Sequence, residues 1–198
     1  MSPTYILRRD DPEATRLLAW GWTVVGGSWG ARLEAGPEDL PRLDALAAAP
    51  EGYRVGLLTA DHAADIAALD EATHGDYPTG EAVFHEVVDE AGATALTERG
   101  VVHGARTASG VLVAVTATRV SGDRVETEFT AVHPAHRRRG LAAAVKAASV
   151  AAGVRAGHRH FGTGGAAVNA GSLAMNRTVG YVVTEQWVTL APPGDQSV

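Results

Sequence analysis

A basic turn that leads from an expected strand into an expected helix is the segment of this sequence best suited to chemistry. The turn reads Val132-His133-Pro134-Ala135-His136-Arg137-Arg138-Arg139-Gly140-Leu141-Ala142. The exposed N–H groups and the dipole at a helix N-terminus bind phosphate groups. Arginines at that positive end are unfavourable for the bare helix, but they add charge and forked donors when an anion lies there. The turn therefore predicts a binding site for a pyrophosphate.

Two carboxylates, Glu126 and Glu128, precede this turn on the same expected strand. Because side chains alternate along a strand, both should share one face of the sheet with Thr130. Like charges held close together favour the protonated form of one of them, which suits a general base that works near neutral pH. The alternative is a pair of exposed acids on an edge strand.

Other residue types that do chemistry give weaker signals. The chain has no cysteine, which excludes disulfides, thiolate nucleophiles and zinc sites of the Cys type. Four histidines lie close in sequence: His133, His136, His158 and His160. They form no His-Glu-x-x-His motif and no nearby carboxylate completes a ligand set, so no metal site is predicted. No serine has a nucleophile-elbow context, and the glycine-rich run 162–165 predicts room for a cofactor or a bulge rather than a phosphate loop.

The charges along the chain fall into two adjacent blocks of opposite sign, although the formal net charge is only −6. Between Arg54 and Arg99 there are ten acids and no Lys or Arg. Between Glu128 and Glu185 there are seven Lys or Arg residues and no acid. The basic block contains the turn and suits a polyanionic ligand, whereas the acidic block suits a cationic one. Solvated helix faces are the alternative for both blocks.

The elements that must position these residues divide the chain into three parts. Residues 1–50 are expected to form a separate N-terminal appendage of the β-α-β type, with a helix capped by Asp11. Residues 53–190 alternate between strand and helix patterns, which predicts an α/β fold with a mixed sheet. Residues 191–198 are expected to be a C-terminal tail.

Within residues 53–190, three expected helices matter for the site. One begins at about Glu81 and should bury Val83, Val87 and Val88. An alanine-rich helix follows the basic turn, and a short helix is capped by Asn169.

In this order and spacing the motifs resemble those of the GNAT acetyltransferase superfamily, over residues 53–190. The run from Arg137 to Ala142 matches the superfamily's Arg/Gln-x-x-Gly-x-Gly/Ala hallmark, and Asn169, Asn176 and Gly180-Tyr181 match its second signature. The resemblance implies a twisted, mostly antiparallel sheet flanked by helices. The spacing from Arg139 to Lys146 looks like the actinobacterial tandem-domain branch that includes mycothiol synthase. Because Gly21-Trp22 and Gly180-Tyr181 begin similar segments, residues 1–50 are interpreted as a truncated copy of half such a domain.

The resemblance implies transfer of an acetyl or other small acyl group from acyl-CoA to a primary amine, with Glu126, followed by Glu128, as the candidate base. It implies acetyl-CoA as the donor, bound by Val132, His133, Arg137, Arg138, Arg139, Gly140, Leu141, Ala142, Asn169 and Asn176. Many members protonate the departing thiolate with a tyrosine, at a position that is Asn176 here. That departure leaves open a catalytically weak CoA-binding domain with a regulatory or structural role.

The acceptor is expected to be a small, cationic amine, because the acidic block covers helices that border the acceptor site in this superfamily. Asp76 and Glu81, beside Pro78, are the expected acceptor-binding residues. A nucleic-acid-binding module would rest on residues 137–139 alone, and the net charge of −6 argues against it. With 45% hydrophobic residues, no apolar run of membrane-spanning length and no signal peptide, the sequence predicts a cytoplasmic protein that binds no membrane. A homodimer is compatible with it.

Overall fold

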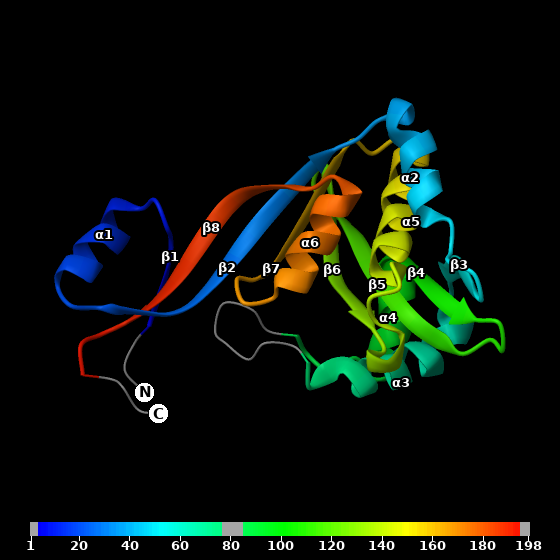
Figure 1. Ribbon diagram of the computed structural model, residues 1–198, viewed down its shortest axis with the longest axis horizontal. Helices are drawn as coiled ribbons and strands as arrows, with labels where there is room; N and C mark the ends of the chain where they lie inside the picture. The colour runs from blue at the N-terminus through cyan, green and yellow to red at the C-terminus, as the bar shows by residue number, and fades with distance from the viewer. Residues whose placement is uncertain (1–3, 77–84, 195–198) are drawn as a thin grey trace.

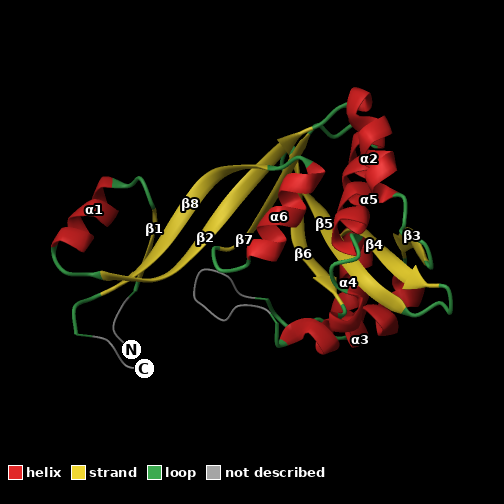
Figure 2. Ribbon diagram, viewed as in Figure 1, coloured by secondary structure: helices red, strands yellow, loops and turns green. Residues whose placement is uncertain are grey.

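The computed structural model describes residues 4–76 and 85–194, and its centre is one eight-stranded sheet with the order β1-β8-β2-β7-β6-β5-β4-β3 (Figure 2). All neighbouring strands are antiparallel except β6 and β7, which are parallel. The strands are β1 (Tyr5–Arg8), β2 (Thr23–Glu34), β3 (Tyr53–Leu58), β4 (Gly100–Thr107), β5 (Leu112–Ser121), β6 (Arg124–Val132), β7 (His160–Ala166) and β8 (Val182–Ala191). The expected α/β fold with a mixed, mostly antiparallel sheet is confirmed.

Helices cover both faces of this sheet. They are α1 (Pro12–Ala19), α2 (Leu40–Ala47), α3 (Ala63–His74), α4 (Glu90–Arg99), α5 (Leu141–Arg155) and α6 (Ala170–Val179). One hydrophobic cluster packs α2, α5 and α6 against one face of the sheet, and another packs α3 and α4 against the opposite face. Because α5 is alanine-rich and apolar on most sides, it is buried between the sheet and α2. No helix within residues 4–76 and 85–194 is long and apolar enough to cross a membrane.

The N-terminal segment is part of the sheet, which differs from the expectation of a separate appendage. Its strand β2 lies between β7 and β8 and pairs with both, and Trp29, Ala31 and Leu33 are buried on one face. The two similar sequence segments are the starts of β2 and β8, which are antiparallel neighbours. Within the N-terminal segment, β1 and α1 lie at the far end of the long β2–β8 ribbon (Figure 1).

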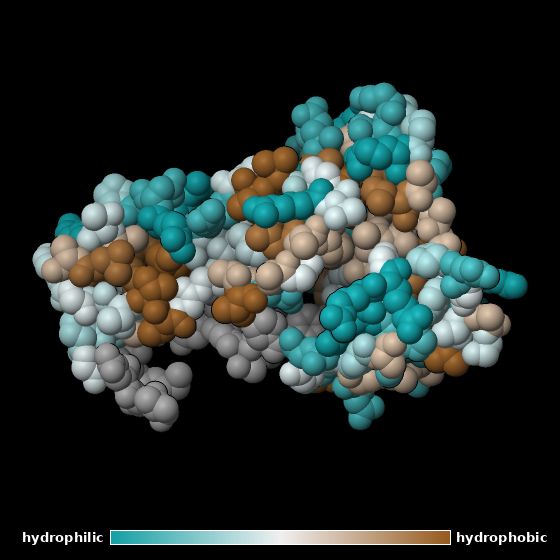
Figure 3. Space-filling view, in the orientation of Figure 1, coloured by the Kyte–Doolittle hydropathy of each residue, from teal (hydrophilic) through white to brown (hydrophobic). Residues whose placement is uncertain are grey.

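The far end of this ribbon carries apolar surface. Figure 3 shows hydrophobic residues gathered around α1 and β1. Trp20, Val24 and Val25 are among the exposed apolar side chains there.

Part of the helix expected from Glu81 lies outside the described residues. This part is residues 81–84, which include Val83, whereas residues 85–89 are described and are irregular. The helix α4 starts after Asp89, whose side chain accepts a hydrogen bond from the N–H of Gly92 and so caps the first turn. Val88 packs against the core, but Val87 is exposed, so its expected burial is wrong.

A β-bulge in β6 overturns the expected alternation of Glu126, Glu128 and Thr130. Thr127 is opposite Thr118 and Phe129 is opposite Ala117, so Glu128 is the extra residue. Val125 packs in the α2/α5 cluster, whereas Phe129 packs in the α3/α4 cluster, although a regular strand would place both on one face. The expectation that Thr130 shares a face with Glu126 is therefore wrong, because the extra residue reverses the alternation between them.

Candidate functional site

A groove of about 960 Å³ opens where β6 and β7 diverge. The parallel ladder between the two strands ends at the pair Glu126 and Gly162. Beyond that pair, the groove is lined by residues 127–132 of β6 and 163–166 of β7, by the N-terminal half of α5 and by α6. Thr73, Asp76 and His85 contribute the wall on the α3 side. The groove therefore brings together the basic turn, the β6 carboxylate region and part of the acidic block.

The basic turn presents an uncapped helix N-terminus to this groove. Arg138 and Gly140 both adopt the left-handed conformation, with φ of 59° and 79°, and Gly140 is the N-cap of α5. No described side chain caps the helix, and its first turn contains no acid. The first N–H groups of α5 are thus available to an anion, and the helix dipole favours one there.

The structure brings most of the predicted CoA-binding residues to the groove. Those that line it are Val132, Arg137, Arg138, Gly140, Leu141, Ala142, Asn169 and Asn176. His133 and Arg139 are not among the lining residues of the described chain. His136 was not among the residues predicted to bind CoA, but it lines the groove and shares a 2.9 Å hydrogen bond with the hydroxyl of Tyr53.

Asp76, a predicted acceptor-binding residue, reaches the groove but pairs with the basic turn. Its carboxylate accepts a hydrogen bond from the guanidinium of Arg137, whose Nε also donates to the carbonyl of Val132 at 3.1 Å. The acidic and basic blocks therefore meet at the end of the groove beside the basic turn. Glu81, the other predicted acceptor-binding residue, lies outside the described residues.

The two candidate bases occupy different positions. Glu128 lines the groove, and its carboxylate is held by Arg99 at 3.0 Å and Arg119 at 2.9 Å. Glu126 is not among the lining residues; its carboxylate lies over Gly162, where any Cβ would collide with it, and 3.8 Å from Arg32. The first glycine of the run 162–165 thus makes room for a carboxylate.

A buried lysine that the sequence analysis did not count as a site residue lies in the groove. Lys146 is only 1% exposed, and its Nζ donates to Thr127 Oγ1 at 2.6 Å and Thr163 Oγ1 at 3.1 Å. Burial lowers the pKa of Lys146 to about 7, opposed by the negative charge of Glu126. The ammonium also lies 5.1 Å from the centre of the Tyr181 ring, and burial raises the pKa of that phenol well above its ordinary value. A single lysine inside an alanine-rich apolar helix was the sequence signal for this residue.

Asn176, at the position where the resemblance implies a tyrosine, offers a buried acceptor. It is 2% exposed, and its Nδ2 donates to the carbonyl of Ser172 at 2.9 Å. Its Oδ1 has no hydrogen-bond partner among the described residues. An unsatisfied buried acceptor costs about 1–3 kcal/mol, so a ligand donor at this point would be favourable.

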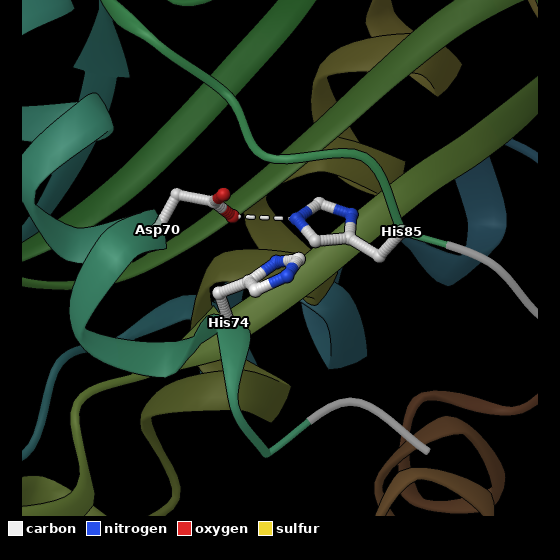
Figure 4. A group of neighbouring side chains, drawn as sticks. All are labelled: Asp70, His74 and His85. Carbon is white, nitrogen blue, oxygen red and sulfur yellow. Dashed lines mark hydrogen bonds and ion pairs between the residues drawn. The ribbon is translucent and has the colours of Figure 1, made fainter. Parts of the chain in front are cut away.

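A second polar cluster on the α3 side was also missed (Figure 4). Asp70 is fully buried and accepts from His85 Nε2 at 2.6 Å and from the N–H of Val88 at 2.9 Å. His74 comes from the same helix, and its Nδ1 is buried without a partner among the described residues. Ligand atoms of the three residues lie within 4.8 Å of one another, which suits a divalent transition metal, but both Asp70 oxygens already accept protein hydrogen bonds. The sequence signal was the Asp70–His74 spacing on one helix, whereas His85 comes from another segment.

Comparisons with known proteins find a similar fold in several solved structures. A tandem GNAT protein from the clavulanic acid biosynthesis pathway matches 94% of this chain with a TM-score of 0.64 and 20% sequence identity. A GCN5-related N-acetyltransferase from Sphaerobacter thermophilus also matches 94% of this chain, with a TM-score of 0.70 and 17% sequence identity. The ribosomal-protein-S18-alanine N-acetyltransferase from Escherichia coli has a TM-score of 0.54 and 18% identity over 71% of this chain and 92% of its own.

This chain spans 62% and 58% of the length of the first two proteins. No family model and no curated protein matches its sequence. The structural matches confirm the GNAT fold that the motifs predicted.

Proposed function

We propose that this chain, which has the fold of the GCN5-related N-acetyltransferases, transfers an acetyl or small acyl group from acyl-CoA to a primary amine. The observation that carries the proposal is the open N-terminus of α5 beside Arg137 and Arg138, at the mouth of the groove between β6 and β7. A pyrophosphate bound there would satisfy the first N–H groups of the helix and both guanidinium groups.

The groove also suits the rest of a CoA thioester. Beyond Glu126 and Gly162, the facing edges of β6 and β7 no longer pair with each other, while their other edges pair with β5 and β2. These facing edges carry backbone donors and acceptors that a ligand can pair with, as an added strand does. The amide-containing arm of CoA therefore fits between them, with its thioester directed towards the point where the strands meet.

The acceptor amine must be neutral before it attacks the thioester, and a carboxylate can take its proton. Glu128 lines the groove beside the bulge, and this supports it as the base. Glu126 was placed first on sequence grounds. Because its carboxylate lies over Gly162 and is not among the groove's lining residues, it would have to act through water. Both residues stay candidates, and their glutamine variants distinguish them.

We propose further that the acceptor is a small cationic amine, such as a molecule of the polyamine or aminoglycoside type. Support comes from the excess of acids between Arg54 and Arg99, the segment that supplies the α3 wall of the groove. Some of these acids have structural partners: Asp65 pairs with Arg106 and Asp76 with Arg137. The attraction would therefore come from the net charge of this side rather than from one carboxylate.

A CoA-binding domain with little turnover is the second candidate, and Asn176 favours it because an amide is not a proton donor of the acid type. The test combines two measurements on the wild-type protein: the rise in Tm with acetyl-CoA, and release of free thiol with a panel of primary amines. Amine-dependent thiol release supports the transferase. A Tm rise without any amine-dependent release would support the binding domain.

A further inference from the structure

Lys146 bridges β6 and β7 at the point where the two strands part. The last ladder pair joins Glu126 to Gly162, and the next residue on each strand is a threonine. The Nζ of Lys146 donates to both threonines, at 2.6 Å to Thr127 and 3.1 Å to Thr163. The ammonium thus lies in the groove, at the point where the two strands part.

The surroundings of Lys146 hold few charges. Glu126 on β6 is the charged group that acts on it, the ring of Tyr181 before β8 lies 5.1 Å away, and the contacts from β6 and β7 are neutral hydroxyls. A protonated lysine donates three hydrogen bonds, and two have partners among the described residues. Burial brings the pKa of Lys146 to about 7, so the side chain exchanges a proton near neutral pH.

We propose that Lys146 donates a proton to the sulfur of CoA when the thioester breaks, an inference that rests on the transferase function proposed above. The amine nitrogen forms a bond to the acyl carbon, and the C–S bond breaks with its electron pair going to sulfur. A proton from Lys146 Nζ completes the thiol. The neutral lysine then takes up a proton that the acceptor nitrogen loses as it becomes an amide. In the overall reaction, acyl-CoA and an amine are converted into an amide and free thiol.

The position of Lys146 explains why this role falls to it rather than to its neighbours. A ligand that enters at the α5 N-terminus and runs between β6 and β7 ends near Lys146. Thr127 and Thr163 are alcohols, and Asn176 is an amide, so none of them is an acid of useful strength. An acid with a pKa near the working pH is the most effective donor to a leaving thiolate.

The test compares Lys146→Met, which removes the charge at similar volume, with Lys146→Arg, which keeps the charge but does not titrate in this range. Ser149→Ala is the matched control. Ser149 is a buried polar residue on the same helix, bonds to Thr118 at 3.1 Å and does not line the groove. Each protein is assayed for the Tm rise with acetyl-CoA, for kcat and KM from thiol release across a pH series, and for intact mass after incubation with acetyl-CoA.

Lys146→Met should lower kcat by about a hundredfold, while KM for acetyl-CoA and the Tm rise stay within about twofold of wild type. The Ser149→Ala protein should match wild type. Wild-type kcat should decline as pH rises above about 7, where Lys146 loses its proton. Lys146→Arg keeps the charge but does not release its proton, so its kcat should also be low and should lack that decline. This combination separates proton donation from a purely structural role.

Three results would overturn this proposal alone. An unchanged kcat in Lys146→Met would show that another group protonates the sulfur. Loss of the acetyl-CoA Tm rise in Lys146→Met, with restoration in Lys146→Arg and no altered pH profile, would assign Lys146 only to holding the strands apart. Acetylation of Lys146 itself would make it an acyl acceptor. A wild-type protein without amine-dependent thiol release refutes the transferase function and this inference together, whereas an active wild type matched by Lys146→Met refutes this inference alone.

Discussion

The carboxylate of Asp70 on α3 and the imidazole of His85 are joined by a 2.6 Å hydrogen bond, and the carboxylate is completely buried. This contact ties the segment before α4 to the end of α3. It places His85 on the groove wall, with its ring 5.0 Å from that of Phe129. The position of His85 on the α3 side of the groove therefore depends on the buried carboxylate of Asp70.

Asp70→Asn should destabilise the protein by about 1–3 kcal/mol, because the amide places a donor against one of two groups that now donate to the carboxylate. Urea unfolding measures the change. Asp65→Asn is the control: Asp65 forms an exposed pair with Arg106, so its loss should cost less than about 1 kcal/mol. Equal losses in the two variants would contradict the importance of the buried pair.

Gly140→Asp should abolish the Tm rise that acetyl-CoA produces, because it places a carboxylate where the pyrophosphate is expected. Gly110→Asp is a matched control. Gly110 also has a positive φ, of 90°, and lies in the β4–β5 turn away from the groove. Both variants should lose some stability, but only Gly140→Asp should lose the response to acetyl-CoA. A normal response in Gly140→Asp would refute the assignment of the basic turn.

Glu128→Gln and Glu126→Gln should distinguish the candidate bases. The variant of the true base should lower kcat by about a hundredfold at neutral pH, with the Tm rise from acetyl-CoA unchanged. The location of Glu128 in the groove favours it, whereas Glu126 is expected to act only indirectly. Normal rates in both variants would mean that bulk water or another group deprotonates the amine.

The stability of the wild type relative to Lys146→Met should increase as pH rises from about 7 to 10. The pKa of Lys146 is about 7 in the folded protein, and its ordinary value of 10.5 applies to the unfolded chain. Between these two pH values the unfolded chain therefore binds more protons than the folded protein. The free energy of unfolding therefore rises with pH there, by at most about 1.4 kcal/mol per pH unit, and the cost of burying the ammonium is complete below pH 7. Urea unfolding of both proteins across this range provides the measurement, and parallel pH curves would contradict the lowered pKa.

Salt should slow the reaction with a polycationic acceptor more than with a neutral one. Charge attraction in solution is screened over about 10 Å at 0.1 M salt, so the attraction between the acidic side of the groove and a cationic amine weakens as the salt concentration increases. The second-order rate constant for each amine, measured over a salt series, reports the difference. A preference for acidic acceptors, with no effect of salt, would show that the acids between Arg54 and Arg99 are only a solvated surface.

The sequence by itself determined the parts of the site that depend on neighbours along the chain. Asp11 and Asn169 cap α1 and α6 as expected, because capping joins residues two or three positions apart. The basic turn was likewise readable, since a glycine with positive φ at the start of α5 and the adjacent arginines are local features. These signals were sufficient to predict the fold and the open helix N-terminus beside the basic turn.

Only the tertiary structure decided how distant segments meet. Pairing of β2 with both β7 and β8 depends on contacts across more than a hundred residues, so its place in the sheet had no local signal. The bulge at Glu128 is a register shift against β5, and it reversed the expected alternation along β6. Lys146 and Asp70 became buried, bonded groups because other segments cover them, and burial is a property of the packed molecule rather than of residue type.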